Sequence, residues 1–96
     1  MKSAQVTVTL IDGDVLTVRT VLRDQIRYED TAKRQKPPWG GVADNPGKWE
    51  GFVSWAALKR TGQVDSTYEA YCDTVADIEF DFDAEVLPTS RANGGA

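Results

Sequence analysis

Apolar and polar residues alternate at the start of the chain, which is typical of strands with one buried face. The alternating apolar residues lie on both sides of the turn-forming stretch IDGD and are Val6, Val8, Leu10, Leu16 and Val18. A three-residue loop at 11–13 pairs Val8 with Leu16 and puts all of these side chains on one face, whereas a two-residue loop divides them between both faces. The pattern therefore predicts a β-hairpin with Gly13 in the left-handed conformation.

The next stretch, up to Pro37-Pro38, is mostly charged and has a thin apolar face, which predicts a surface helix. Thr20 is expected to cap the start of this helix, and the two prolines end it. The loop KPPWGGVADNPG follows. We expect its Trp39 to fold back onto the core, because an isolated exposed tryptophan is uncommon.

The segment FVSWAALKRTG belongs to a second helix, with Asn45 as N-cap, Pro46 at the first helical position and Gly62 as C-terminal stop. Its main apolar stripe is formed by Trp49, Phe52, Val53 and Ala56. Trp55 and Leu58 lie off that stripe. They are either core residues of a helix that is covered on all sides, or part of an exposed apolar patch that binds a partner. The pattern alone leaves both interpretations open.

A capping box, STYE at residues 66–69, predicts the start of a third helix. The residues on its apolar stripe are Tyr68, Tyr71, Cys72 and Val75. We therefore expect Cys72 to be buried as a small hydrophobic residue. The alternation in DIEFDFD predicts a short third strand at 78–82, and residues 84–96 have the composition of a flexible tail. The chain is thus expected to form one α+β domain over residues 1–83, with a β-hairpin, three helices and this short strand.

Charge is spread unevenly along the chain, which has a net charge of −4. Residues 1–60 contain ten Lys or Arg and seven Asp or Glu, a balance of +3. Residues 61–96 contain one Arg and eight acids, a balance of −7. An acidic chain is not expected to bind nucleic acid, which needs a basic surface. The acidic end is either a solvated surface or a face for a partner.

Candidate catalytic groups are few. The chain has no histidine and one cysteine, which excludes histidine-based acid–base catalysis and an internal disulfide. The acids from residue 77 to 85 follow strand alternation and lack the EF-hand pattern, so they indicate a solvated face rather than a cation site. We expect no cofactor, no metal and no enzymatic activity. Without a signal-peptide core or a run of ~20 apolar residues, a cytoplasmic protein is expected.

An ordered set of segments resembles the tail assembly chaperones of long-tailed bacteriophages of actinobacteria. The segments are VTLIDGDVLTVRT, RDQIRYEDTAKRQ, a loop with a tryptophan, FVSWAALKRTG, STYEAYCDTVADIEF and LPTS, over roughly residues 6–89. The matching residues are Arg23, Asp24, Arg27 and Glu29; Trp55, Ala56, Ala57, Arg60 and Gly62; and Thr67, Tyr68 and Glu69. Family members more often have Trp in place of Tyr28 and often Phe in place of Tyr68.

The resemblance implies a non-enzymatic role in building the phage tail. Such chaperones bind the long, largely helical tape-measure protein before tube subunits polymerise around it, and they are absent from the finished virion. A longer form arises by ribosomal frameshifting, and this chain looks like the short form. The implied partners are the tape-measure protein, then the tail tube protein and further copies of the chain, in the host cell cytoplasm.

For partner contact we expect the apolar side chains of Trp55, Leu58, Trp39 and Tyr28, with Arg23, Arg27 and Arg60 as rim charges. Arg60 can instead cap the second helix or pair with an acid of the first helix, Asp24 or Glu29. Two other functions stay open. A small β-grasp-like adaptor would have strand content well above a hairpin and one strand. An acidic phage-encoded inhibitor that mimics nucleic acid would carry its acids in one exposed stripe.

Overall fold

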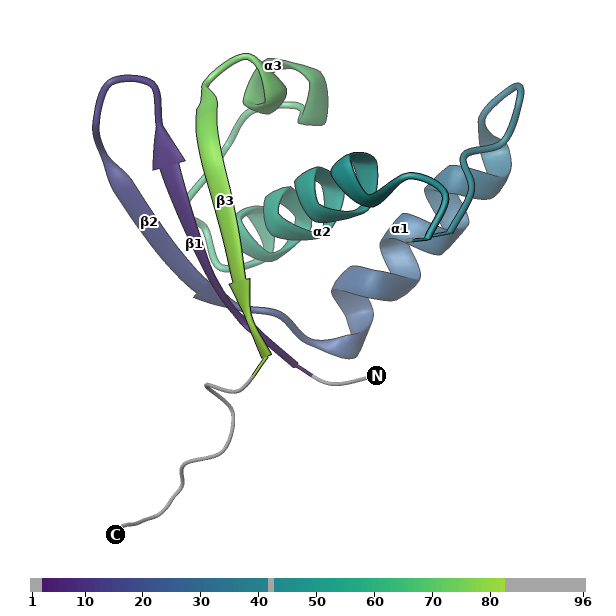
Figure 1. Ribbon diagram of the computed structural model, residues 1–96, viewed down its shortest axis with the longest axis horizontal. Helices are drawn as coiled ribbons and strands as arrows, with labels where there is room; N and C mark the ends of the chain where they lie inside the picture. The colour runs from purple at the N-terminus through teal and green to yellow at the C-terminus, as the bar shows by residue number, and fades with distance from the viewer. Residues whose placement is uncertain (1–2, 42, 83–96) are drawn as a thin grey trace, which may run out of the picture.

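An antiparallel sheet and three helices form the part of the chain that the computed structural model describes, residues 3–41 and 43–82. The elements in chain order are β1 (Gln5–Leu10), β2 (Val15–Arg19), α1 (Leu22–Arg34), α2 (Pro46–Arg60), α3 (Tyr68–Cys72) and β3 (Val75–Asp81). The prediction of an α+β chain with a hairpin, three helices and a later strand is confirmed (Figure 1). The predicted tail at 84–96 lies outside the described residues.

The β1–β2 hairpin has the predicted register. Val6 lies opposite Val18 and Val8 lies opposite Leu16. Gly13, in the loop between the strands, has a φ of +97°, as a three-residue loop requires. This register puts Val6, Val8, Leu16 and Val18 on the face that the helices cover, and it leaves the exposed Val15 on the other face with the threonines.

β3 pairs with the other side of β1, which makes β1 the central strand in the order β2-β1-β3. It begins at Val75 rather than at the predicted residue 78. An irregularity in register between Thr9 and Leu10 sets Val75 opposite Leu10, while Ile78 lies opposite Val8. Residues 75 and 78 differ in parity, so strict alternation would send their side chains to opposite faces. The bulge keeps both on the inner face.

The third helix is shorter than predicted. Thr67 caps its start instead of Ser66, and its hydroxyl accepts a backbone N–H three residues later at 3.2 Å. The helix ends at Cys72, after which the N–H of Thr74 donates to the carbonyl of Tyr71 at 2.9 Å and turns the chain into β3. Such a short helix has one fully buried position, Tyr71. The expectation of a buried Cys72 is wrong, because this side chain is exposed.

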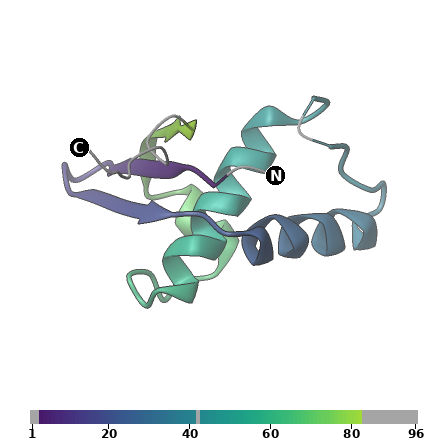
Figure 2. The same cartoon turned by 90° about the horizontal axis from the view of Figure 1, so that it is seen from below.

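α2 is the central helix of the domain. It crosses the inner face of the sheet, and α1 packs against its opposite side (Figures 1 and 2). Every residue from 51 to 58 is buried, because the helix has neighbours on all sides. As predicted, it begins at Pro46 and ends ahead of Gly62, whose φ is +81°. Among the described residues, no helix is both long and apolar enough to cross a membrane.

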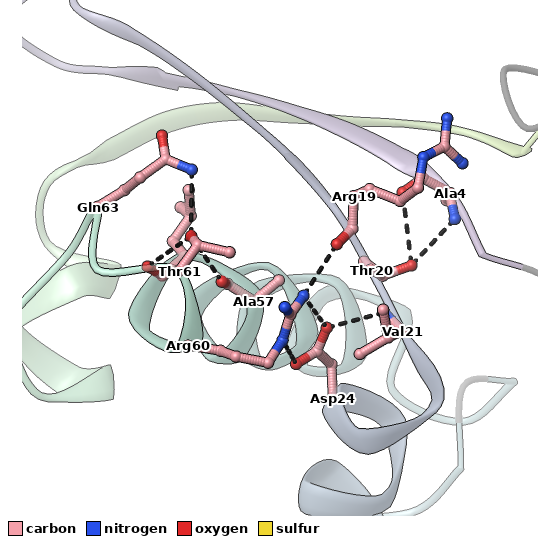
Figure 3. A network of polar contacts seen from close by, with 10 residues as sticks. Ala4, Arg19, Thr20, Val21, Asp24, Ala57, Arg60, Thr61 and Gln63 are labelled. Atoms are coloured by element: carbon pink, nitrogen blue, oxygen red, sulfur yellow. Dashed lines mark hydrogen bonds and ion pairs between the residues drawn. The ribbon is translucent and has the colours of Figure 1, made fainter.

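The start of α1 differs from the prediction. Its N-cap is Val21, and the predicted cap Thr20 is buried beside the N-terminal strand. The N–H of Thr20 donates to the carbonyl of Ala4 at 2.9 Å, and its hydroxyl accepts the N–H of Ala4 at 3.0 Å (Figure 3). The carboxylate of Asp24 accepts the N–H of Val21 at 2.9 Å instead. A contact with the distant Ala4 therefore replaces the local cap that the sequence favours.

Gly62→Ala should lower the free energy of unfolding by about 1–2 kcal/mol, because a φ of +81° is strained for any residue with a Cβ. No atom lies within 4 Å of the added methyl, so the cost is conformational only. Gly47→Ala in the first turn of α2 meets equally open space and is the matched control. It should be neutral or stabilising by up to about 1 kcal/mol. Urea unfolding followed by circular dichroism measures the free energy of unfolding of both variants. Equal changes in this free energy would contradict the assignment of a left-handed conformation to Gly62.

Candidate partner-binding site

Trp55 and Leu58, the two residues that the sequence left ambiguous, lie in the core. Leu58 is fully buried and Trp55 is 8% exposed. The indole N–H of Trp55 donates to the carbonyl of Ser66 at 2.9 Å, and the charged ends of Arg27 and Lys59 each lie 5.5 Å from its ring centroid. The hydrogen bond of Trp55 thus holds the α2–α3 connection in place, and its ring makes cation–π contacts with Arg27 and Lys59. This corrects the expectation that either side chain forms an exposed contact patch.

Arg60 is also occupied within the domain. Its Nε lies 3.0 Å from Oδ1 of Asp24, and its Nη2 lies 3.1 Å from Oδ2 of the same carboxylate. The same Nη2 donates to the carbonyl of Arg19 at 3.0 Å (Figure 3). Asp24 is fully buried, while the Arg60 side chain is 33% exposed. Of the alternatives for Arg60, pairing with Asp24 is confirmed, and a role as a free rim charge is not supported.

The segments that carry the family resemblance meet in this region. Asp24 of the RDQIR segment holds Arg60 of the WAALKRTG segment, and Arg27 lies over Trp55. Tyr68 of the STYE segment lies 6.0 Å from Trp55, ring centroid to ring centroid. These residues therefore hold α1, α2 and α3 together. Arg23 is exposed on α1 and is the one predicted arginine for which no contact is described.

Trp39 folds back onto the domain as predicted and stays partly exposed. Its ring stacks on Tyr28 at 6.1 Å with an interplanar angle of 28°, and it meets Phe52 edge-on at 6.3 Å. Its backbone N–H donates to the carbonyl of Ala32 at 3.1 Å. Tyr28, which was expected to contact a partner, is buried beneath this ring. Its hydroxyl donates to the carbonyl of Gly40 at 2.6 Å, which anchors the loop from below.

Two hollows flank Trp39, and we call this region the Trp39 surface. The larger hollow has a volume of ≈ 410 Å³ and is lined by Gln35, Lys36, Pro37, Pro38, Trp39, Asn45 and Lys48. The smaller hollow, of ≈ 180 Å³, is mostly apolar and is lined by Tyr28, Glu29, Ala32, Lys33, Pro38, Trp39, Gly40 and Gly41. An indole with space on two sides can be covered further by a partner, which is the usual setting of an aromatic anchor.

The rim of the Trp39 surface is basic. Lys33, Lys36 and Lys48 line the hollows, with Glu29 as the acid among their lining residues. The ammonium group of Lys48 lies 5.1 Å from the centroid of the Trp39 ring. Lys48 is not among the residues predicted from the sequence, although its position in the first turn after Asn45 brings it next to the loop that precedes the helix.

The arrangement offers binding rather than an identifiable reaction. In the described ranges, no group of three or more His, Cys, Asp or Glu could hold a metal ion. The acids Asp77, Glu79 and Asp81 are exposed along β3. Burial raises the pKa of Tyr28, with a smaller contribution from nearby Asp44. Burial also raises the pKa of Tyr68 and of Tyr71, so the tyrosines favour the neutral form.

Replacing Asp24 tests whether its ion pair with Arg60 stabilises the fold or is a surface ion pair with little effect on stability. Asp24→Asn keeps the shape but leaves Arg60 without its counter-charge, which should lower the free energy of unfolding by about 2–4 kcal/mol. Asp30→Asn changes an exposed carboxyl on the same helix and should cost less than about 0.5 kcal/mol. Chemical denaturation of both variants measures the difference, and two similar small losses would refute the role of Asp24.

Alkaline titration tests the burial of the tyrosines. Because the folded-state pKa values of all three are raised above 10.0, their stabilising contribution is complete below about pH 10 and is lost as the pH rises further. We expect phenolate absorbance to rise together with unfolding, and Tyr68→Phe to remove about a third of the absorbance change. Phenolate formation near pH 10 in a chain with native circular dichroism would contradict this packing.

Comparison of the chain with protein-family models, with curated proteins and with solved structures found no match in any of the three.

Proposed function

We propose that this protein is a tail assembly chaperone of a long-tailed phage, which binds the tape-measure protein and keeps it soluble until tube subunits enclose it. The observation that carries the proposal is the meeting of the three resembling segments around Asp24, Arg60 and Trp55. Contacts among these segments are what a fold shared with that family would require, and the chaperone role itself is carried over from the resemblance. The role is non-catalytic.

The Trp39 surface is the part of the domain that we assign to the client. A tape-measure protein presents apolar helical stripes before assembly, and such a stripe can lie in a groove beside an aromatic anchor. The smaller hollow beside Trp39 offers apolar contact, and the lysines around both hollows suit the acidic residues that flank apolar stripes on a helix. Small hollows favour weak, reversible binding, which a chaperone that must leave the finished tail requires.

The proposed setting follows from the same role. The chaperone acts in the cytoplasm of the host cell and is absent from the mature virion. The tape-measure protein is the principal partner, and contacts with the tail tube protein or between copies of the chaperone belong to the same assembly step.

The alternatives receive less support. For a β-grasp-like adaptor, strand content well above a hairpin and one strand would be expected, and the described strands are the hairpin and β3. For an inhibitor that mimics nucleic acid, the exposed stripe of acids on β3 contains Asp77, Glu79 and Asp81 within the described residues. Three carboxylates are a short stretch for a surface that must replace a run of phosphates.

Co-expression with the tape-measure protein of the same phage tests the proposal. The client should stay in the soluble fraction with the wild-type chaperone and precipitate without it. Lys48→Glu should shift most of the client to the pellet, because it reverses the rim charge next to Trp39. Lys59→Glu is the matched control, since Lys59 lies over Trp55 at the other end of the same helix and should leave the client soluble.

Two results would overturn the proposal. Equal precipitation of the client with and without the chaperone would refute the chaperone role. Equal effects of Lys48→Glu and Lys59→Glu would refute the assignment of the client to the Trp39 surface. Circular dichroism of both variants ensures that a loss of solubility does not come from an unfolded chaperone.

A further inference from the structure

The two edges of the sheet differ in how their backbone groups are satisfied. The carbonyl of Thr17 in β2 accepts the side-chain amide of Gln63 at 3.0 Å, and the carbonyl of Arg19 accepts Arg60 at 3.0 Å. Both carbonyls point away from β1, so side chains from the α2–α3 connection and the end of α2 cover the β2 edge. Figure 3 shows the contact of Arg60 with the carbonyl of Arg19. No strand can pair there without displacing them.

The β3 edge is open by comparison. The hydrogen bonds of Ala4 and Leu10 to the β2 side show that the even-numbered residues of β1 face β2, so the odd-numbered ones face β3. Their opposite residues 77, 79 and 81 therefore bond to β1. The N–H and C=O groups of Ile78 and Phe80 point outwards, and no hydrogen bond of theirs occurs in the part of the chain that the structure describes. Figure 1 shows β3 as the outermost strand on this side.

An apolar floor lies below this edge. The rings of Trp49 and Phe80 are 5.2 Å apart, and Phe80 stacks on Phe82 at 5.9 Å. Phe82 is 39% exposed, and Trp49 and Phe80 are partly exposed. A strand added beside β3 would place every second side chain on this inner face, where further apolar area can be buried.

The opposite face of the same edge is acidic. Asp77, Glu79 and Asp81 project on the outer face of β3, beside a hollow of ≈ 370 Å³ lined by Gln5, Thr7, Glu79, Phe80 and Asp81. Basic side chains of an added strand would therefore find both opposite charge and space on this face. A second copy pairing β3 to β3 would instead set acids against acids across the pair, which disfavours self-association at this edge.

We propose that the β3 edge binds an extended segment of a partner protein in which basic and apolar residues alternate, adding a fourth strand to the sheet. The unpaired groups of Ile78 and Phe80 supply the hydrogen bonds, the aromatic floor takes the apolar residues, and the carboxylates select the basic ones. This surface is separate from the Trp39 surface and goes beyond the proposed client site. Strand addition, unlike helix docking, recognises the backbone of the partner.

Synthetic heptapeptides test this edge, with KVKVKVK as the probe and EVEVEVE as the control of reversed charge. We expect the basic peptide to bind at least tenfold more tightly and to slow amide hydrogen exchange at Ile78 and Phe80, measured by NMR. The added strand is proposed to run antiparallel to β3, as the other strand pairs of the sheet do. The residues opposite Ile78 and Phe80 are then the valines of the probe, and the valine N–H groups face β3. N-methylation of the valines should therefore abolish binding, whereas N-methylation of the lysines should leave it nearly unchanged.

Protein variants complete the test. Asp77→Lys with Glu79→Lys reverses two exposed charges without touching the inner face, and it should shift the preference towards EVEVEVE. Lys48→Glu should leave peptide binding unchanged, so failure at this edge is distinguishable from failure at the Trp39 surface. Equal weakening by both patterns of N-methylation, or binding without slowed exchange at Ile78 and Phe80, would overturn the proposal and leave only charge attraction.

Discussion

The fold depends on one buried carboxylate. Asp24 sits without solvent contact in the first turn of α1, where an unpaired charge would carry a large desolvation cost. It accepts the N–H that starts its own helix and the guanidinium that ends α2, while this guanidinium also holds the last carbonyl of β2. The end of the hairpin, the start of α1 and the end of α2 are thereby fixed at one point. Because each partner comes from a different element, the network sets the relative orientation of all three.

This junction explains why α2 can be covered on all sides. With its end tied to β2 and to α1, the helix lies between the sheet and α1, and Tyr71 closes a further side through a hydrogen bond to Ser54 at 2.7 Å. The buried residues of this one central helix therefore form much of the core of the domain.

Local patterns predicted those elements whose determinants are local. The parity of Val8 and Leu16 fixed the hairpin register, and Pro46 and Gly62 marked the ends of α2. The predictions failed where a contact with a residue far away in the sequence determines the local structure. The hydroxyl of Thr20 accepts the N–H of Ala4 instead of capping α1, and the bulge at Thr9 moves the start of β3 to Val75.

The candidate site was partly predictable for a related reason. The packing of Trp39 against the core was predictable, because an isolated exposed tryptophan in a loop is uncommon. For Trp55 the spacing could not decide, since a helix covered on all sides and one with an exposed patch have the same pattern. Its burial depends on the position of α1 and of the α2–α3 connection, which no local window contains.

The order of strands also has a consequence for synthesis. β1 leaves the ribosome well before its second partner β3, which is the last element that the structure describes. Until residues 75–81 have been translated, one side of the central strand has no partner, and Val6 and Val8 lack half of their neighbours in the sheet. Pairing over so long a sequence separation is slow, and the three described strands can pair only after β3 has been translated. A nascent chain stopped in α3 would therefore expose the unpaired side of the central strand, which can pair with another chain.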